Sequence, residues 1–294
     1  MTNAKSPPVF RASLVQLCSG RDPDRNVADA SALIRKAAAA GSVYIQTPEV
    51  TNVMEVDREA LFKAAEPEAE NRALSAFRSL ASELGIWLHI GSLAVRKSED
   101  KLANRSYLIS PDGAIAARYD KIHMFDVSLA NGEVYSESTN YAAGNQAVVA
   151  ATPWGGLGMT ICYDLRFPYL FRTLAQSGAR LIAVPAAFTQ PTGEAHWHVL
   201  LRARAIETQS FVFAAGQGGT HEHGRKTYGH SLIISPWGEV LAEGGEAPGV
   251  ITADIDMAKL EEVRDRVPSL RPNAAFSVSA DAAAGRPAAG GKPA

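Results

Sequence analysis

The chain has 294 residues and a formal net charge of −2, and its hydrophobic (46%) and charged (20%) fractions are those of a globular protein. Acidic and basic residues are mixed along the chain, so no basic stripe indicates a nucleic-acid partner. Two cysteines are too few for a disulfide framework, which favours a reducing, cytoplasmic location. Residues 1–8 lack an apolar segment of signal-peptide length, and no run approaches the ~18 apolar residues of a membrane span. We therefore expect neither a membrane nor a nucleic-acid partner.

Patterns typical of strands and helices alternate along most of the chain. Helices are expected where apolar residues recur at helical spacing, over residues 24–40, 68–84, 167–177, 194–209 and 257–266. Strands are expected in apolar or alternating runs, over residues 10–17, 43–46, 86–91, 103–109, 114–118, 148–151, 157–161, 180–184, 211–215, 231–234, 239–241 and 250–255. Gly41 and Gly85 are expected to end the first two helices. The segment Pro111-Asp112-Gly113 predicts a hairpin turn.

This order of elements predicts a mixed α/β layered fold. No linker-like break precedes Pro272, so we expect one domain. Residues 131–144 are polar and are expected to form a loop. Residues 274–294 are rich in Ala, Gly and Pro and lack a periodic apolar face, which predicts a disordered tail.

Cys162 stands where the apolar run of residues 157–161 ends and helical character begins. A free thiol with a pKa of about 8.5 supplies little thiolate at neutral pH, so a reactive cysteine needs a base. Glu49 and Lys121 also follow predicted strands, and the carboxyl ends of strands in an α/β sheet gather around one crevice. There the carboxylate can take the thiol proton, the ammonium can stabilise an oxyanion, and the thiolate can attack a carbonyl carbon.

Three segments resemble the signatures of the nitrilase superfamily of carbon–nitrogen hydrolases. They are Pro48-Glu49, Tyr119-Asp120-Lys121-Ile122-His123 and Ile161-Cys162-Tyr163-Asp164-Leu165-Arg166-Phe167-Pro168. The family's Glu-Lys-Cys triad maps onto Glu49, Lys121 and Cys162, and its second glutamate matches Glu137. The resemblance covers residues 9–271 and implies a single-domain α-β-β-α sandwich. It also implies that no metal or organic cofactor is needed and that the chain forms a homodimer or a higher homo-oligomer.

Other segments resemble the amidase-like branch of the superfamily rather than the true nitrilases. They span residues 194–197, 200–207, 228–231 and 236–238. Within this branch the chain resembles the deaminated glutathione amidases most and the ω-amidases second. This implies a cysteine-dependent amidase that releases ammonia from a small carboxylate-bearing amide, with deaminated glutathione as the leading substrate and α-ketoglutaramate as the alternative. A nitrilase or a carbamoylase of the same superfamily stays open.

The resemblance also implies a role for each site residue. Glu49 deprotonates Cys162, whose thiolate attacks the carbonyl carbon to give a thioester, and Glu49 then activates the water that hydrolyses it. Lys121 and the backbone N–H of Tyr163 hold the oxyanion. Glu137 orients either Lys121 or the water, or else it is a solvated carboxylate. The candidates for substrate contacts are Arg166, His196, Trp197 and His230.

One position departs from the family pattern. The family often has glutamate after the Phe-Pro of the cysteine segment, where this chain has Tyr169. The change leaves the triad intact and affects either an ion pair behind the site or the substrate pocket. Asp164 and Arg166 form a structural pair, or Arg166 faces the substrate; the sequence does not separate these readings.

The remaining alternatives have less support. A redox-sensing Cys162 lacks a resolving partner, because Cys18 belongs to another predicted strand. A papain-like pair needs one of seven histidines, and nothing singles one out. His221, His223 and His230 lack an acidic or thiol ligand to complete a metal site, so we expect none. A non-catalytic binding protein would be free to lose the triad, which is intact.

Overall fold

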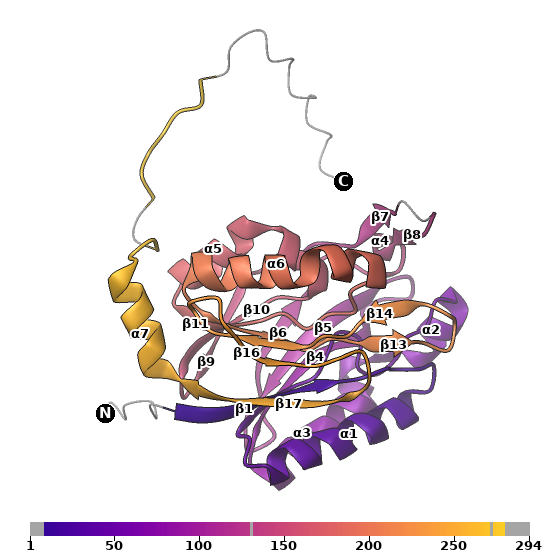
Figure 1. Ribbon diagram of the computed structural model, residues 1–294. Helices are drawn as coiled ribbons and strands as arrows, with labels where there is room; N and C mark the ends of the chain where they lie inside the picture. The colour runs from indigo at the N-terminus through magenta and orange to yellow at the C-terminus, as the bar shows by residue number, and fades with distance from the viewer. Residues whose placement is uncertain (1–8, 130–131, 271–272, 280–294) are drawn as a thin grey trace.

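The computed structural model describes residues 9–129, 132–270 and 273–279, which build two β-sheets packed face to face with helices on both outer sides (Figure 1). The first sheet has seven strands in the order β17-β1-β2-β4-β5-β6, with β3 beside β4. These strands are β1 (Val9–Gln16), β2 (Tyr44–Gln46), β3 (Glu66–Pro67), β4 (Trp87–Arg96), β5 (Leu102–Ile109), β6 (Ile115–Asp120) and β17 (Gly249–Asp256).

The second sheet has six strands in the order β16-β15-β12-β11-β10-β9. They are β9 (Val148–Thr152), β10 (Gly155–Met159), β11 (Ala179–Ala183), β12 (Phe211–Ala214), β15 (Leu232–Ile234) and β16 (Val240–Glu243). Neighbours β10, β11 and β12 run parallel, as do β1, β2 and β4 in the first sheet. The carboxyl ends of parallel strands share an edge, so residues that follow them are brought together.

Helices form the two outer layers. The first sheet is covered by α1 (Pro23–Ala39) and α3 (Arg72–Leu84), and the second by α5 (Pro168–Gln176) and α6 (Gln190–Thr208) (Figure 1). The chain then closes with α7 (Met257–Arg266), which directly follows β17. The expected α-β-β-α sandwich is confirmed. No helix within the described ranges is long and apolar enough to cross a membrane.

Strand β1 shows how side-chain alternation separates two cores. Ala12 and Leu14 belong to the cluster that fills the space between the sheets. Val15 points the other way and packs with Ile34 of α1 and Phe77 of α3. Successive strand residues face opposite sides, so a strand buried on both faces reads as a nearly continuous apolar run.

Capping residues explain where α1 and α3 begin and end, and the two glycines predicted to end them lie at those ends. The carboxylate of Asp22 accepts hydrogen bonds from the first backbone N–H groups of α1, and the Asn71 side chain does so for α3. Gly85 ends α3 at φ +64°, a left-handed conformation that glycine adopts without strain. Gly41, just beyond the end of α1, also has a positive φ of +87°.

The expected loop over residues 131–144 is wrong in part. It contains β8 (Val134–Ser136), which pairs with β7 (Asp126–Ser128), and the one-turn helix α4 (Glu137–Asn140). Helix α2 (Arg58–Ala64) and the hairpin of β13 (Gly218–Thr220) and β14 (Lys226–Tyr228) were also not expected. Elements of three or four residues are too short to show a period, and β13 begins with two glycines. Helix α2 has seven residues but buries only Leu61, so it carries no apolar stripe.

Two further expectations need adjustment or go untested. The helix expected from residue 68 starts as a short 3-10 turn, η1 (Glu68–Glu70), and α3 begins only after Asn71. In the expected tail, residues 274–279 hold no helix or strand, and residues 280–294 lie outside the described ranges.

Candidate active site

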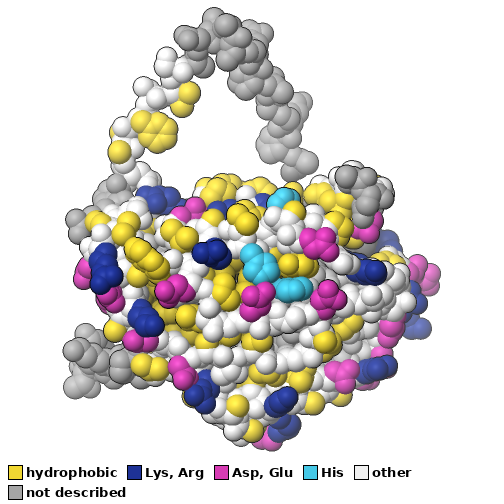
Figure 2. Space-filling model, viewed as in Figure 1, with side chains coloured by type: hydrophobic (Ala, Val, Ile, Leu, Met, Phe, Trp, Pro, Cys, Tyr) yellow, Lys and Arg dark blue, Asp and Glu magenta, His cyan; other side chains and the backbone are white. Residues whose placement is uncertain are grey.

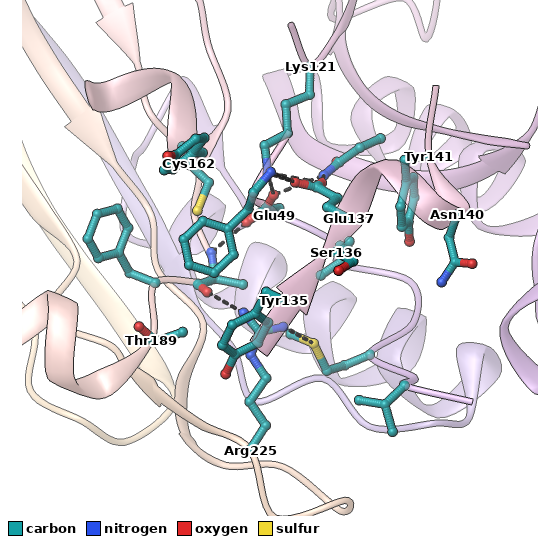
Figure 3. Close-up of a pocket in the computed structure, with 18 of the residues that line it drawn as sticks. Glu49, Lys121, Tyr135, Ser136, Glu137, Asn140, Tyr141, Cys162, Thr189 and Arg225 are labelled. Carbon is teal, nitrogen blue, oxygen red and sulfur yellow. Dashed lines mark hydrogen bonds and ion pairs between the residues drawn. The ribbon is translucent and has the colours of Figure 1, made fainter. Parts of the chain in front are cut away.

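A cavity of about 330 Å³ opens at the edge of the sandwich where strands of both sheets end (Figure 3). Glu49 follows β2 and Lys121 follows β6 of the first sheet, whereas Cys162 follows β10 of the second. Glu137, the first residue of α4, completes the group. The structure therefore brings together the four residues that the sequence motifs single out, and all four line the cavity.

Lys121 lies at the centre of this group. Its Nζ is 2.8 Å from Oε1 of Glu49 and 2.8 Å from Oε2 of Glu137. The Lys121 side chain is 2% exposed and that of Glu49 is 6% exposed, so this ion pair is cut off from bulk water. Burying these charges is tolerable only because each is paired and hydrogen-bonded.

Further donors fix the two carboxylates. The side-chain amide of Asn104, in β5, donates to Glu49 Oε1 at 2.9 Å and to Glu137 Oε1 at 3.0 Å. The backbone N–H of Ala187 donates to Glu49 Oε2 at 2.8 Å, and that of Phe125 donates to Glu137 Oε2 at 2.7 Å. The analysis of motifs did not find Asn104. Within the predicted strand, Asn104 stands beside the polar residues Arg105 and Ser106, so the sequence alone does not separate it from them.

Behind Glu49, two segments of the chain come so close to β4 that one residue of this strand must lack a side chain. A Cβ added to Gly91 in β4 would lie 2.1 Å from the carbonyl oxygen of Thr47 and 2.5 Å from Cβ of Pro185. These contacts are far shorter than real ones, so only glycine fits at this position. Gly91 thereby lets the segments that carry Glu49 and Ala187 pack against the same strand.

The electrostatics of the group follow from burial and pairing. Burial alone would raise the pKa of Glu49, but the charge of Lys121 and hydrogen bonds from Lys121, Cys162 and Asn104 outweigh it and lower that pKa. Burial works against the charged form of Lys121, yet the charges of Glu137 and Glu49 raise its pKa well above the usual value. Burial and the charge of Glu49 raise the pKa of the Cys162 thiol well above its usual value. The resting group is thus a carboxylate, an ammonium and a neutral thiol.

Cys162 sits on a tight turn. It begins the 3-10 helix η2 (Cys162–Arg166) with a positive φ of +49°, which costs a residue with a side chain about 1–2 kcal/mol. Its own N–H donates to the carbonyl of Pro185 at 2.9 Å. The next backbone N–H, that of Tyr163, finds no acceptor in the described part of the chain. An unused donor beside the thiol is suited to binding a developing negative charge.

Asp164 holds the turn that carries Cys162 in place by hydrogen bonds to both of its carboxylate oxygens. Its Oδ2 accepts hydrogen bonds from the Tyr119 hydroxyl at 2.7 Å and from the Ile161 N–H at 2.8 Å. Its Oδ1 accepts from His123, at 3.1 Å from the backbone and 2.6 Å from Nδ1. The reading of Asp164 and Arg166 as a structural pair is therefore wrong. Tyr169, the departure from the family pattern, reaches the same network because its hydroxyl contacts Nε2 of His123.

The four predicted substrate contacts do not line the cavity. Trp197 is 1% exposed and donates from its indole nitrogen to the carbonyl of His230, so it belongs to the core. Arg166 lies near His196, at 3.3 Å from Nδ1, and its guanidinium stands over the ring of Phe188. Arg166, His196 and His230 thus lie near one wall of the site without reaching the cavity.

The histidines occupy structural positions. None of the seven in the sequence lines the cavity with Cys162, which leaves a papain-like pair without a base. Among the described residues, no group of three or more His, Cys, Asp or Glu is arranged to hold a metal ion. His221 is hydrogen-bonded through both ring nitrogens, to the Ser19 carbonyl and to the Thr227 hydroxyl, each at 2.8 Å.

The outer part of the cavity carries a second cation. Arg225, just before β14, donates from Nη2 to the carbonyl of Ala187 at 2.8 Å. Its guanidinium carbon lies 5.1 Å from the centre of the Tyr135 ring, and Nη1 is 3.8 Å from the sulfur of Met54 (Figure 3). Arg225 could not be singled out from the sequence, because no motif surrounds it.

This sandwich, with a buried glutamate–lysine pair beside a cysteine at a strand end, agrees with the family match. Residues 11–265 match the carbon–nitrogen hydrolase family. The chain belongs to this family, within the nitrilase superfamily that its motifs resemble, and it is a hydrolase acting on carbon–nitrogen bonds.

Individual relatives agree with this assignment. A deaminated glutathione amidase of Yersinia enterocolitica is 41% identical over 89% of this chain and 92% of its own length. The human deaminated glutathione amidase is 37% identical over 87% of this chain and 80% of its own.

Solved structures share the fold. The Nit3 protein of Saccharomyces cerevisiae superimposes with a TM-score of 0.81 at 27% identity, covering 91% of this chain and 97% of that one. The NitFhit protein of C. elegans gives 0.84 at 34% identity over 90% of this chain, which spans 64% of that protein.

Proposed function

We propose that Glu49, Lys121 and Cys162 form the catalytic triad of a cysteine-dependent amidase. The observation that carries this proposal is the buried ion pair of Lys121 and Glu49, 2.8 Å long, in one cavity with the Cys162 thiol. A thiol with a raised pKa needs a base at the moment of attack, and the lowered pKa of Glu49 keeps that base ionised at neutral pH.

The steps follow from these protonation states. Glu49 takes the proton of Cys162 as the thiolate attacks the amide carbon, and the developing oxyanion is held by Lys121 and the N–H of Tyr163. Glu49 then passes the proton to the leaving nitrogen, and a thioester forms on Cys162. Water, deprotonated by Glu49, hydrolyses the thioester. Each oxyanion donor of this kind is typically worth about 3–4 kcal/mol of barrier.

Glu137 has a positioning role in this scheme. Its carboxylate accepts hydrogen bonds from Lys121, Asn104 and the backbone of Phe125, and none from the thiol within the described structure. Held by three donors, it fixes the ammonium between two negative charges. Lys121 can therefore point at the carbonyl oxygen without a change of rotamer, which is what preorganised stabilisation requires.

The substrate we propose is deaminated glutathione, because relatives 37–41% identical to this chain carry that activity in their names. This refines the expectation of ammonia as the product. Deaminated glutathione contains only secondary amides, so its hydrolysis releases an amine fragment; ammonia is released only from a primary amide such as α-ketoglutaramate. Both substrates give α-ketoglutarate when the bond to the α-ketoglutaryl group is cleaved. The same product can therefore be assayed for both.

The test is release of α-ketoglutarate from the two substrates by wild-type protein, Cys162→Ala and the matched variant Cys18→Ala. We expect Cys18→Ala to keep the wild-type rate, Cys162→Ala to lose activity, and deaminated glutathione to be preferred. Preference for α-ketoglutaramate would assign an ω-amidase. Unchanged hydrolysis by Cys162→Ala would contradict the triad.

A homodimer is part of the proposal, and the outer face of α6 supports it. Leu201 and Ala205 pack inward, yet Val199 (69% exposed) and Ile206 (51%) point out, and Trp237 (55%) is exposed as well. Large apolar side chains exposed on one side of a helix can mark a protein–protein contact. Hydrophobic side chains gather over α5 and α6, at the top of the view in Figure 2.

The dimer can be tested by light scattering coupled to size-exclusion chromatography. Wild-type protein is expected at twice the chain mass, and the double variant Val199→Lys, Ile206→Lys at the mass of one chain. A monomeric wild type at micromolar concentration would contradict the proposal.

A cytoplasmic location is proposed from the two free thiols, Cys18 and Cys162. Cell fractionation would test it, and recovery from an oxidising compartment would contradict it.

A further inference from the structure

The outer cavity holds a positive charge that no described carboxylate neutralises. The cavity is lined by two cations, Lys121 and Arg225, and by three carboxylates, Glu49, Glu55 and Glu137. Glu49 and Glu137 are bound to Lys121, and Glu55 lies 3.0 Å from Arg21. Within the described ranges, this leaves Arg225 as the lining cation without an ion pair.

The hydrogen bonds of Arg225 are also incomplete. A guanidinium has five N–H donors. In the described structure one goes to the Ala187 carbonyl, one faces the sulfur of Met54, and Nε is buried without any acceptor. A thioether is a weak acceptor, so a strong acceptor entering the cavity would find unused donors on this group.

A single residue, Ala187, also connects Arg225 to the proposed base, Glu49. The peptide of Ala187 donates its N–H to Glu49 Oε2, and its carbonyl accepts from Arg225 Nη2. The guanidinium is thus one amino acid away from the proposed base. A small ligand held by Arg225 would have its other end near Cys162 and Glu49, as Figure 3 shows for the arrangement of these side chains.

We infer that Arg225 forms a subsite for a carboxylate of the substrate. The inference rests on the proposed function, because it deals with how that same cavity selects acidic amides. The planar fork of arginine matches a carboxylate, and Tyr135 holds the guanidinium plane by packing against it. In the proposed substrate, the carboxylate belongs either to the α-ketoglutaryl group or to the leaving fragment, and the experiment distinguishes these sources.

The experiment compares wild type, Arg225→Gln and Arg225→Lys on three substrates. They are α-ketoglutaramate, deaminated glutathione, and deaminated glutathione with its glycine carboxyl group converted to an amide. Loss of a charged hydrogen bond is expected to raise KM about 10- to 100-fold in Arg225→Gln, with kcat changed much less. Arg225→Lys restores part of the affinity, because it keeps the charge and loses the fork.

The pattern across substrates locates the carboxylate. A raised KM for all three assigns the subsite to the α-ketoglutaryl carboxylate. A raised KM for unmodified deaminated glutathione alone assigns it to the leaving fragment. Arg25→Gln, which removes an exposed arginine on α1, is the matched control and is expected to keep the wild-type constants.

Two outcomes contradict the inference. One is an equal fall of kcat on all three substrates with KM unchanged, since this is what a purely structural tether of Ala187 would give. The other is no change in Arg225→Gln. Failure of the proposed function is distinguishable from both, because then the wild-type protein itself hydrolyses none of the three.

Discussion

The ammonium nitrogen of Lys121 lies 2.8 Å from Oε1 of Glu49, and neither side chain is more than 6% exposed. At this depth each charge depends on its partner rather than on bulk water. Removing one charge therefore leaves the other buried and uncompensated, which typically costs more than the pair contributes. The contact on which the proposed triad is built therefore also makes the stability of the fold depend on both residues.

Lys121→Met is expected to lose both stability and activity. Two buried carboxylates, those of Glu49 and Glu137, would face each other without a cation, which costs about 3–5 kcal/mol in comparable buried pairs. Activity should fall by a factor of about 100 or more, because an oxyanion donor is lost. Urea unfolding and α-ketoglutarate release measure the two effects.

The second variant Lys121→Met, Glu137→Gln separates these losses. It removes one of the two uncompensated charges, so stability is expected to recover in part while activity stays low. The exposed Lys36→Met on α1 serves as the control for loss of a lysine. If Lys121→Met were as stable as this control, Lys121 would not be compensating the two buried carboxylates.

Glu49→Gln is expected to make Cys162 more reactive toward alkylation although it abolishes hydrolysis. The charge of Glu49 helps to raise the thiol pKa, and the charge of Lys121 lowers it. With the glutamate neutral, the thiol pKa falls and more thiolate is present at pH 8. The rate of iodoacetamide labelling checks this. It is measured in a Cys18→Ala background, so that Cys162 is the thiol that is labelled.

Glu55→Gln is the matched variant for that measurement. It removes another carboxylate of the cavity, one that is paired with Arg21. Its labelling rate should stay near that of the wild type. Labelling of Glu49→Gln no faster than wild type would show that the glutamate does not hold the thiol in its neutral form.

Asp164→Asn is expected to destabilise the turn that carries Cys162. An amide in place of the carboxylate turns an NH₂ group toward two of the donors from Tyr119, Ile161 and His123. Each buried donor left unsatisfied costs about 1–3 kcal/mol. Tyr119→Phe removes a single donor and should cost about 1 kcal/mol. If urea unfolding gave the same loss of free energy for Asp164→Asn and Tyr119→Phe, Asp164 would not be holding the turn through several donors.

His89 is expected to make the fold sensitive to acid. It is fully buried in β4 between the hydroxyls of Tyr44 and Ser106, and burial lowers its pKa from 6.5 to about 3. Between these two values the unfolded chain binds a proton that the folded chain does not. Lowering the pH through this window therefore favours unfolding, by up to about 1.4 kcal/mol per pH unit.

The slope of unfolding free energy between pH 6.5 and 4 tests this. His89→Gln is expected to have a smaller slope than wild type. His221→Gln should reduce the slope too, because burial lowers the pKa of His221 to about 4. If wild type and His89→Gln had the same slope, His89 would not be the titrating group.

Much of the fold could be predicted because long elements carry a period. The apolar stripe that includes Leu74, Phe77 and Leu80 predicts α3, and the buried run after Gly156 predicts β10. The proposed triad can be recognised from the sequence because Glu49, Lys121 and Cys162 each stand beside a strand within a distinctive motif. Strand ends meet at one edge of a sheet, so chain position alone indicated their proximity.

The rest depends on side-chain geometry. Asn104 and Arg225 are single polar residues whose partners lie far away in the sequence, so no local pattern marks them. The role of Asp164 was misjudged because its neighbour in sequence, Arg166, points elsewhere, whereas its real partners come from β6 and the segment after it. Contacts of this kind become visible only when the two sheets are packed together.

The pairing of the first and seventeenth strands has a consequence for how the protein is made. Strand β1 lies between β2 and β17, with Val9 opposite Asp256, so among the described strands the one that is made first must wait for the one that is made last. Contacts across such a separation form late, since a long loop must close first. Until synthesis passes Asp256, the open edge of β1 offers unpaired backbone groups to other chains. Chaperone dependence should therefore be greatest for nascent chains that end just short of β17.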